Sequence, residues 1–144
     1  MIFNIFDFEI GKKSKGKIIS RIGLESDAEV VDKKYNFFKE ISQSNYKRIS
    51  CIFVDEAQFL SKIQVRSLSK IADELNIPIM CYGIRTDFQG KLFEGSSELL
   101  AIADNLKELK TICSQCDKKA TMVVRLNADG EIVLEGKKVM IGGN

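Results

Sequence analysis

The sequence predicts an α/β fold, and three observations support this class. Residues 51–54 form an apolar run that leads directly into two adjacent carboxylates, Asp55 and Glu56. Apolar residues recur at helical spacing over 61–75, and a second short apolar run follows at 78–83. A strand, a helix and another strand in this order are typical of a parallel sheet with crossover helices. Strands of such a sheet are buried by helices on both faces, so we expect the first run to be a central strand.

The other elements follow from the same local signals. Ser61 is the predicted N-cap of the helix that ends at Leu75, and Asn76 closes this helix before Pro78. The predicted apolar face of this helix consists of Ile63, Leu68, Ile71 and Leu75. An Asp-Gly turn signal at 127–130 predicts a hairpin. In chain order, the predicted elements are a strand over 1–10, a basic loop over 11–17, an extended piece over 18–22, a mainly helical segment over 28–45, a buried strand over 50–54, the helix over 61–75, a strand over 78–83, a helix over 96–103, and hairpin strands over 120–126 and 131–139.

Composition limits the classes of protein to which the chain can belong. Its 144 residues are enough for one domain with a sizeable core. The net charge of +2 gives no global field that would attract nucleic acid or a membrane surface. No apolar run reaches membrane-spanning length and the first residues lack a signal pattern, so we expect a cytoplasmic protein. The chain has no histidine, which excludes histidine bases, Ser-His-Asp triads and Cys₂His₂ zinc sites, and its four cysteines are expected to be reduced.

Asp55 and Glu56 are predicted to emerge where open α/β sheets place their ligands, at the carboxyl end of a strand. An apolar strand followed by two carboxylates is the Walker B arrangement, in which one carboxylate holds Mg²⁺ and its neighbour can act as a base. The alternative is an ordinary core strand followed by a solvated acidic turn. The loop at 85–93 contains Phe88 and Phe93, which either line a pocket for a flat polar ligand such as a nucleobase or pack as core residues.

Two further motifs carry candidate ligands. Cys113 and Cys116 have the spacing of half a zinc ribbon, and because a tetrahedral site needs two such pairs, the predicted zinc site is incomplete. A redox role is less well supported, because the motif does not follow the first strand of a thioredoxin-like unit.

Residues 11–17 satisfy the pattern G-x-x-x-x-G-K of a phosphate-binding loop. Ile18 follows where Mg²⁺ needs a hydroxyl, and no helix begins there, so we interpret this lysine-rich stretch as a basic turn.

Several segments resemble one enzyme family in order and at its spacing. They are FVDEAQFL at 53–60, CYGIRTDF at 81–88, LKTIC at 109–113, VMIGG at 139–143 and, near the amino terminus, the stretch 16–24. Together these segments resemble the cellular-type (type II, zinc-containing) thymidine kinases, and the stretch at 16–24 matches the bacterial branch. The resemblance extends over nearly the whole chain from about Phe8 onward.

The resemblance implies a P-loop NTPase (RecA-like) fold and transfer of the γ-phosphoryl group of ATP to the 5′-hydroxyl of thymidine. Glu56 matches the proton acceptor of the family, and Asp55, with Gln58 nearby, matches the carboxylate linked to Mg²⁺ and ATP. Phe88 matches the aromatic residue over the base, and Phe93 lies in the same loop. The segment whose backbone groups hold the thymine edge is matched by Lys138, Val139, Met140, Ile141 and Gly142.

The resemblance also implies a homo-oligomer, a tetramer in the family, with structural zinc at Cys113 and Cys116. Family members begin with a strand, a phosphate-binding loop and a helix, whereas the first predicted strand here resembles the family's second. The chain ends at Asn144, before the family's second cysteine pair. We therefore expect a kinase shortened at both ends, with a truncated P-loop kinase domain over 1–106, a partial zinc-ribbon or lasso β domain over 107–144, and impaired activity.

Two other classes of function stay open at this point. A non-catalytic thymidine kinase remnant would fold without turnover. A small zinc-ribbon binding module would not need Asp55 or Glu56, and its partner surface would lie near Cys113.

Overall fold

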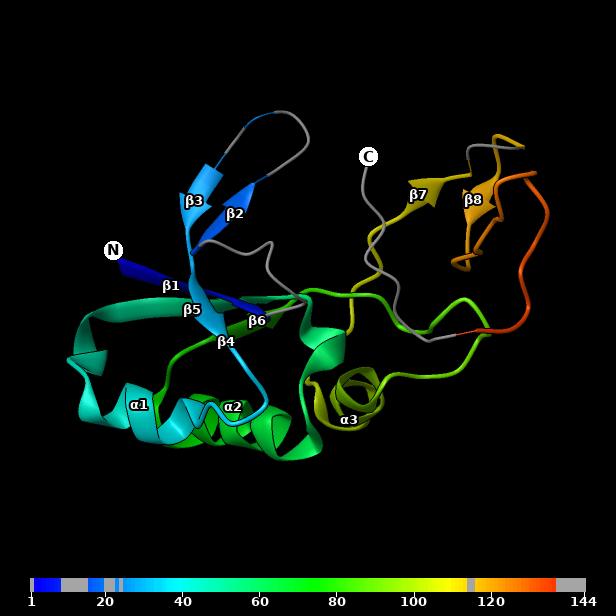
Figure 1. Cartoon of the computed structure of the whole chain (residues 1–144). Coiled ribbons are helices and arrows are strands. Elements are labelled where there is room, and N and C mark those ends of the chain that lie inside the picture. The colour runs from blue at the N-terminus through cyan, green and yellow to red at the C-terminus, as the bar shows by residue number, and fades with distance from the viewer. Residues whose placement is uncertain (1, 9–15, 20–22, 24, 114–115, 137–144) are drawn as a thin grey trace.

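A four-stranded parallel sheet forms the centre of the computed structural model, which describes residues 2–8, 16–19, 23, 25–113 and 116–136. The strands follow the spatial order β4-β1-β5-β6, and every ladder between them is parallel (Figure 1). Their bounds are Ile2–Phe8 for β1, Glu29–Val31 for β4, Ile49–Asp55 for β5 and Ile79–Cys81 for β6. The α/β class, the central strand and the strand after the crossover helix are therefore confirmed.

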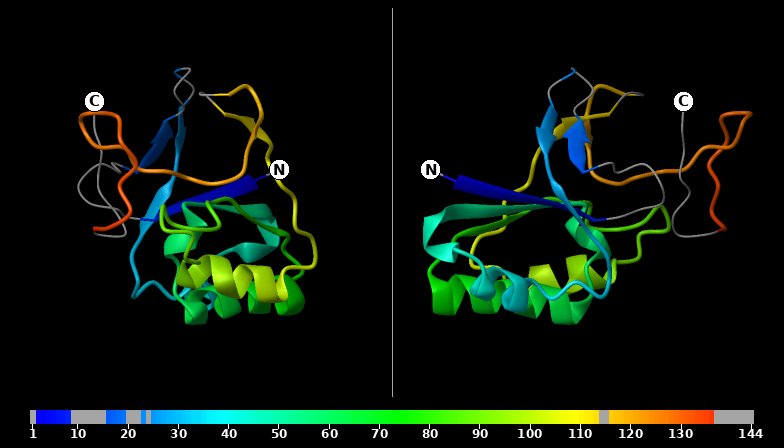
Figure 2. Two further views of the ribbon diagram at one scale, coloured as in Figure 1. Left: turned by 90° about the vertical axis from the view of Figure 1, so that its right-hand side faces the viewer. Right: turned by 60° about the vertical axis from the view of Figure 1, so that its left-hand side comes forward.

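All helices of the described residues lie on one face of this sheet (Figures 1 and 2). They are α1 (Phe37–Gln43), α2 (Lys62–Leu75) and α3 (Glu94–Ile102). The core lies between the sheet and α1 and α2, and its largest buried side chains include Phe6, Phe37, Ile52, Leu60 and Ile71. The expectation that helices cover both faces is thus wrong for the described part of the chain.

The other face of the sheet carries an apolar row. Phe53 on β5 is in register with Ile5 on β1 and with Met80 on β6, and successive residues of a strand point to opposite faces. The residues next to Phe53, Ile52 and Val54, belong to the core on the helical face. Phe53 and Ile5 are half-buried, whereas Met80 is 45% exposed. This face is therefore apolar and only partly covered.

Helix α2 has the predicted ends, and Leu68, Ile71 and Leu75 of its predicted apolar face lie in the core or pack against it. Ser61 and Gln64 form a reciprocal capping box, and Asn76 adopts the left-handed conformation that ends the helix. Ile63, predicted to face the core, is 81% exposed, and Val65 is buried instead. Residues 65, 68 and 71 share one side at a spacing of three, whereas Ile63 lies about 200° from Val65 around the helix axis.

The segment 28–45 is helical only in its second half. Val30 pairs with Asp7 of β1, so the β-branched residues at 30 and 31 form β4 instead of a helix. The helix begins after Asn36, whose side chain accepts a hydrogen bond from Lys39 N at 3.0 Å. A short 3₁₀ turn, η1 (Tyr46–Arg48), then leads into β5.

Gly16 and Lys17, which end the G-x-x-x-x-G-K motif, enter a strand and not a helix. Strand β2 (Lys17–Ile19) pairs antiparallel with β3 (Glu25–Asp27). Lys17 Nζ forms an exposed ion pair with Glu25 Oε1 at 2.7 Å. A phosphate-binding loop opens a helix, so the alternative of a basic turn is favoured here. Residues 11–15 of the motif lie outside the described part.

The C-terminal segment forms less regular structure than expected. Strands β7 (Thr111–Ile112) and β8 (Lys119–Ala120) form a short antiparallel pair. The hairpin predicted over 120–139 is present only as a turn with one isolated bridge, Leu126 to Ile132, up to the last described residue at 136. Among the described residues, no side chain after Glu98 is buried, so no packed layer stabilises longer strands here.

Candidate functional site

Glu56 leaves the carboxyl end of β5 through a sharp turn. Its φ of 50° is in the left-handed region, and a 3₁₀ turn, η2 (Ala57–Phe59), follows directly. The Asp55 carboxylate stabilises this turn, because its Oδ1 accepts a hydrogen bond from Glu56 N at 2.9 Å. A non-glycine residue in this conformation costs about 1–2 kcal/mol, and such strain is concentrated at functional sites. The predicted pair of carboxylates therefore lies at the edge of the sheet where α/β proteins bind ligands.

Gln58 holds the Glu56 side chain against the loop after β6. The Gln58 side chain is 3% exposed, and its Nε2 donates to Glu56 Oε2 at 2.5 Å. Its Oε1 accepts from Ile84 N at 3.2 Å. Both ends of the amide are thus engaged, and the Glu56 carboxylate, which is half-buried, is oriented by a side chain that cannot move freely. Gln58, predicted on the nucleotide side, contacts the Glu56 carboxylate and the loop after β6.

Two glycines allow the close packing that surrounds this turn. A Cβ atom on Gly83 would lie 2.3 Å from Gln58 Oε1 and 3.1 Å from Gln58 N. A Cβ atom on Gly95, at the start of α3, would lie 2.4 Å from Ala57 O. Only glycine fits at these two positions, so the loop after β6 and the first turn of α3 both pack closely against η2.

Asp7 is a functional candidate that the sequence analysis missed. It is the register partner of Asp55 on the neighbouring strand β1, so the two carboxylates extend from the same face at the same edge. The signal was present in the sequence, because β1 is also an apolar strand that runs into a carboxylate. Only the pairing of β1 with β5 brings the two residues together.

The two phenylalanines of the loop after β6 have different environments. Phe93 is 7% exposed and packs edge-on against Phe59 of η2 at 5.4 Å between ring centroids, as a core residue would. Phe88 is half-buried, and the guanidinium carbon of Arg125 lies 3.9 Å from its ring centroid. Of the two, Phe88 is the one with a ring surface that a planar ligand could use.

The four cysteines are all free thiols. Cys113 and Cys116 flank the turn between β7 and β8, and Cys116 is exposed. Across the described residues, no group of three or more metal-ligating side chains comes together, so these two thiols fit only half of a zinc site. Cys51 lies in β5 and Cys81 in β6, where burial raises the pKa of the Cys81 thiol to about 12 and also raises the pKa of Cys51.

The structure does not describe every predicted site residue. Lys138, Val139, Met140, Ile141 and Gly142 lie outside the described residues, so the thymine-edge segment stays a prediction.

In the part of the chain that is described, no helix is long and apolar enough to cross a membrane.

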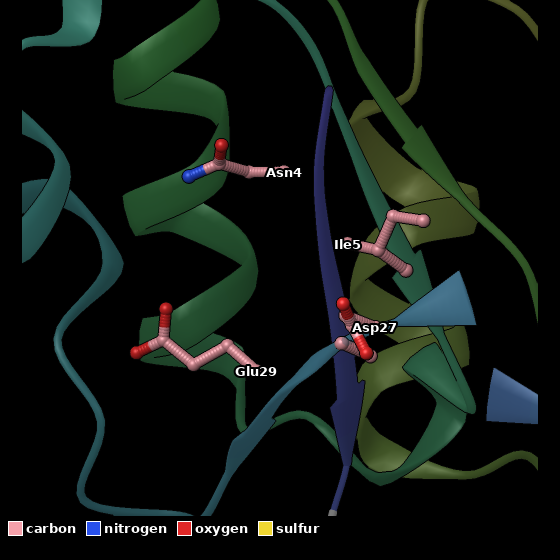
Figure 3. Close-up of a pocket in the computed structure, with 5 residues that line it drawn as sticks. Asn4, Ile5, Asp27 and Glu29 are labelled. Atoms are coloured by element: carbon pink, nitrogen blue, oxygen red, sulfur yellow. The ribbon is translucent and has the colours of Figure 1, made fainter. Parts of the chain in front are cut away.

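An open hollow of about 340 Å³ lies away from these residues, between β1 and the chain that leads from β3 into β4. Figure 3 shows Asn4 and Glu29 extending to one side of β1, with Ile5 and Asp27 on the other. Glu29 is already engaged, because its Oε1 accepts a hydrogen bond from the Tyr35 hydroxyl at 2.7 Å. None of the predicted site residues lines this hollow.

Comparison with known proteins agrees with the resemblance noted from the motifs. The family model described as thymidine kinase matches residues 5–144. A thymidine kinase of Mesorhizobium japonicum is 55% identical over 132 residues, which are 91% of this chain and 64% of the relative. Thymidine kinases of Shewanella oneidensis (55% identical, 90% of this chain, 68% of the relative) and Rhizobium meliloti (50% identical, 100% of this chain, 73% of the relative) match similarly. The chain therefore spans about two thirds of the length of these relatives, and it belongs to the thymidine kinase family.

Proposed function

We propose that this chain carries out, or contributes the thymidine side of, the transfer of the γ-phosphoryl group of ATP to the 5′-hydroxyl of thymidine. The observation that supports this most directly is the Glu56 carboxylate, held by Gln58 at the end of β5. Phosphoryl transfer needs positioning and charge neutralisation more than covalent chemistry. A fixed carboxylate at this edge, with a half-exposed aromatic ring on the next loop, meets part of that need.

Glu56 is the proposed proton acceptor. A substrate hydroxyl that bonds to its free oxygen, Oε1, would transfer its proton there as the new bond to phosphorus forms. Because Oε2 accepts the hydrogen bond from Gln58, Oε1 is the oxygen that would face the substrate. The adjacent η2 turn packs closely against Gly83 and Gly95, and this packing would restrict movement of the carboxylate.

Asp55 is the proposed carboxylate for Mg²⁺. Its Oδ1 is used by Glu56 N, so Oδ2 is the oxygen that would hold the ion, with Asp7 beside it on β1. Hard oxygen ligands of this kind fit Mg²⁺. Bound Mg²⁺ would neutralise charge on the ATP phosphates.

Thymidine recognition is assigned to Phe88 and to the backbone of residues 138–142. Phe88 would stack on the base, and Phe93 would support the loop from the core side. The proposed zinc at Cys113 and Cys116 needs two more ligands, which a neighbouring chain of a homo-oligomer could supply. The proposed compartment is the cytoplasm, where thiols stay reduced.

Titration calorimetry of the full chain with thymidine, together with label transfer from radiolabelled ATP in the presence of Mg²⁺, tests this proposal. We expect thymidine to bind, and Phe88→Ala to weaken binding by about 5- to 150-fold, the range for loss of one stacked base. Phe38→Ala serves as the control, because Phe38 lies under Lys70 on the helical side, away from the site. A folded chain that neither binds nor labels thymidine contradicts the proposal.

A further inference from the structure

Arg125 makes a contact that the proposed reaction does not explain. Its guanidinium carbon lies 3.9 Å from the ring centroid of Phe88, which is van der Waals spacing for a stacked cation. The two residues come from segments far apart in the sequence, the loop after β6 and the turn before the chain's C-terminal end. A guanidinium at this distance fills the ring face that it covers.

The loop that carries Phe88 is stiffened from within. Asp87 Oδ1 accepts hydrogen bonds from Gln89 N and Lys91 N, both at 2.9 Å. Asp87 N donates to Lys91 O at 2.9 Å, and Gly90 N donates back to Asp87 O at 3.0 Å. The Phe88 ring is therefore presented by a closed turn and not by a loose loop.

The turn that carries Arg125 is also closed by its own hydrogen bonds. Asn127 Oδ1 accepts from Asp129 N at 3.0 Å and from Glu131 N at 2.8 Å. Val133 N donates to Arg125 O at 2.9 Å, which places Arg125 at the base of the turn. The Arg125 side chain thus starts from a fixed backbone position.

Side chains join these two turns across the gap. Gln89 Nε2 donates to Leu134 O at 2.8 Å, and Thr86 Oγ1 lies 4.0 Å from Met122 Sδ. Both of these contacts are exposed, so each stabilises the position of the C-terminal turn against the loop only weakly.

We propose that Arg125 acts as a gate on the nucleobase site: it covers the Phe88 ring in the ligand-free chain, and the base displaces it. This inference rests on the proposed function, in which Phe88 stacks on thymine. A base that stacks on the ring face under Arg125 competes with the guanidinium for that face. A ligand must break the cation–π contact before it stacks, so the gate lowers affinity and favours ligands that stack well.

Proton NMR of the full chain tests the position of Arg125 without any ligand. Protons above an aromatic face are shielded by the ring current, so the Arg125 side-chain signals should lie upfield and should return to ordinary positions in Phe88→Leu. Unshifted Arg125 signals in the unsubstituted chain would overturn the proposal. On addition of thymidine, the same signals should move downfield as the guanidinium leaves.

Thymidine titration of substituted chains tests the gate itself. Arg125→Ala should bind thymidine about two- to thirtyfold more tightly, the range between an exposed and a desolvated cation–π contact, because both side chains are half-buried. Arg48→Ala, the loss of an exposed arginine in η1, should leave affinity unchanged. Weaker binding by Arg125→Ala would overturn the gate and make Arg125 a residue that holds the base.

The outcomes also separate the gate from the proposed function. If thymidine binds and Arg125→Ala leaves its affinity unchanged, the gate alone is wrong. A second outcome is that the ring-current shift is present but neither the unsubstituted chain nor Arg125→Ala binds thymidine. The proposed function is then wrong, and the gate is wrong as well because no base binds at Phe88.

Discussion

Glu56 and Asp55 are neighbours in sequence but have different environments, and this difference predicts different roles. Glu56→Gln keeps an oxygen that can accept the bond from Gln58, so it removes the base with little change in geometry. In a chain supplied with the strand, phosphate-binding loop and helix with which family members begin, we expect turnover to fall by about 10²–10⁴-fold, the range for lost proton transfer, with thymidine affinity nearly unchanged. Asp55→Asn should instead raise the Mg²⁺ concentration needed for half-maximal rate, because an amide is a poorer ligand for a hard cation.

Initial rates measured against Mg²⁺ and thymidine concentration distinguish these effects, and Glu40→Gln on the exposed side of α1 is the control. Near-normal turnover of Glu56→Gln would show that the carboxylate is structural and that its left-handed turn has no part in proton transfer.

The cysteines should differ in reactivity because burial raises the pKa of Cys81 and Cys51, whereas the Cys116 side chain is exposed. The thiolate is the reactive form, and burial raises the pKa of Cys81 to about 12, so little thiolate is present there at pH 8. Iodoacetamide at about pH 8 should label exposed Cys116 well before Cys81, as mass spectrometry of the digested chain would show. Equal labelling rates in the folded chain would contradict this, and unfolding in guanidinium should remove the difference.

The same shift has a consequence for stability. Folded Cys81 keeps its proton above the unfolded pKa of 9.0 and up to about 12. Its contribution to stability is therefore complete below pH 9.0 and is lost as the pH rises through this window.

At the scale of elements, the orientation of α2 about its own axis can be tested by comparing Ile63 with Leu68. Ile63 was predicted in the core but is 81% exposed, whereas Leu68 is 2% exposed. Leu68→Ala should lower the free energy of unfolding by about 2–5 kcal/mol, the cost of a cavity beneath the sheet. Ile63→Ala should change it by less than about 0.5 kcal/mol. Urea titrations followed by circular dichroism measure both, and a large loss for Ile63→Ala would mean that its side chain is covered in solution.

Helix ends were easier to predict from the sequence than helix faces. Ser61 and Asn76 bound α2 as expected because capping depends on residues within a few positions of each other. The buried side of α2 depends on Gln64, whose Nε2 bonds to Asp32 O at 2.7 Å and so allows a polar side chain to replace an apolar one in the core. That partner is 32 residues away, and no local pattern indicates it.

For the whole molecule, the sequence indicated the parallel sheet and the position of Asp55 and Glu56, because an apolar run and the residues after it are local features. It did not indicate β4 or the alignment of Asp7 with Asp55, because both arise from pairing between distant strands. The separation of Phe93 from Phe88 likewise depends on Phe59, which packs against only one of them.

The open face of the sheet leads to the last prediction. Parallel sheets are normally covered on both faces, yet here Met80 is 45% exposed in the row with Ile5 and Phe53. The chain should therefore bind a hydrophobic dye such as anilinonaphthalene sulfonate in its folded state. Met80→Lys should reduce dye fluorescence and change stability by less than about 0.5 kcal/mol, because a lysine there reaches solvent. Val54→Lys, on the buried helical face, should unfold the chain. Absence of dye binding by the folded chain would show that this face is covered in solution, and Met80→Lys would then be destabilising instead of neutral.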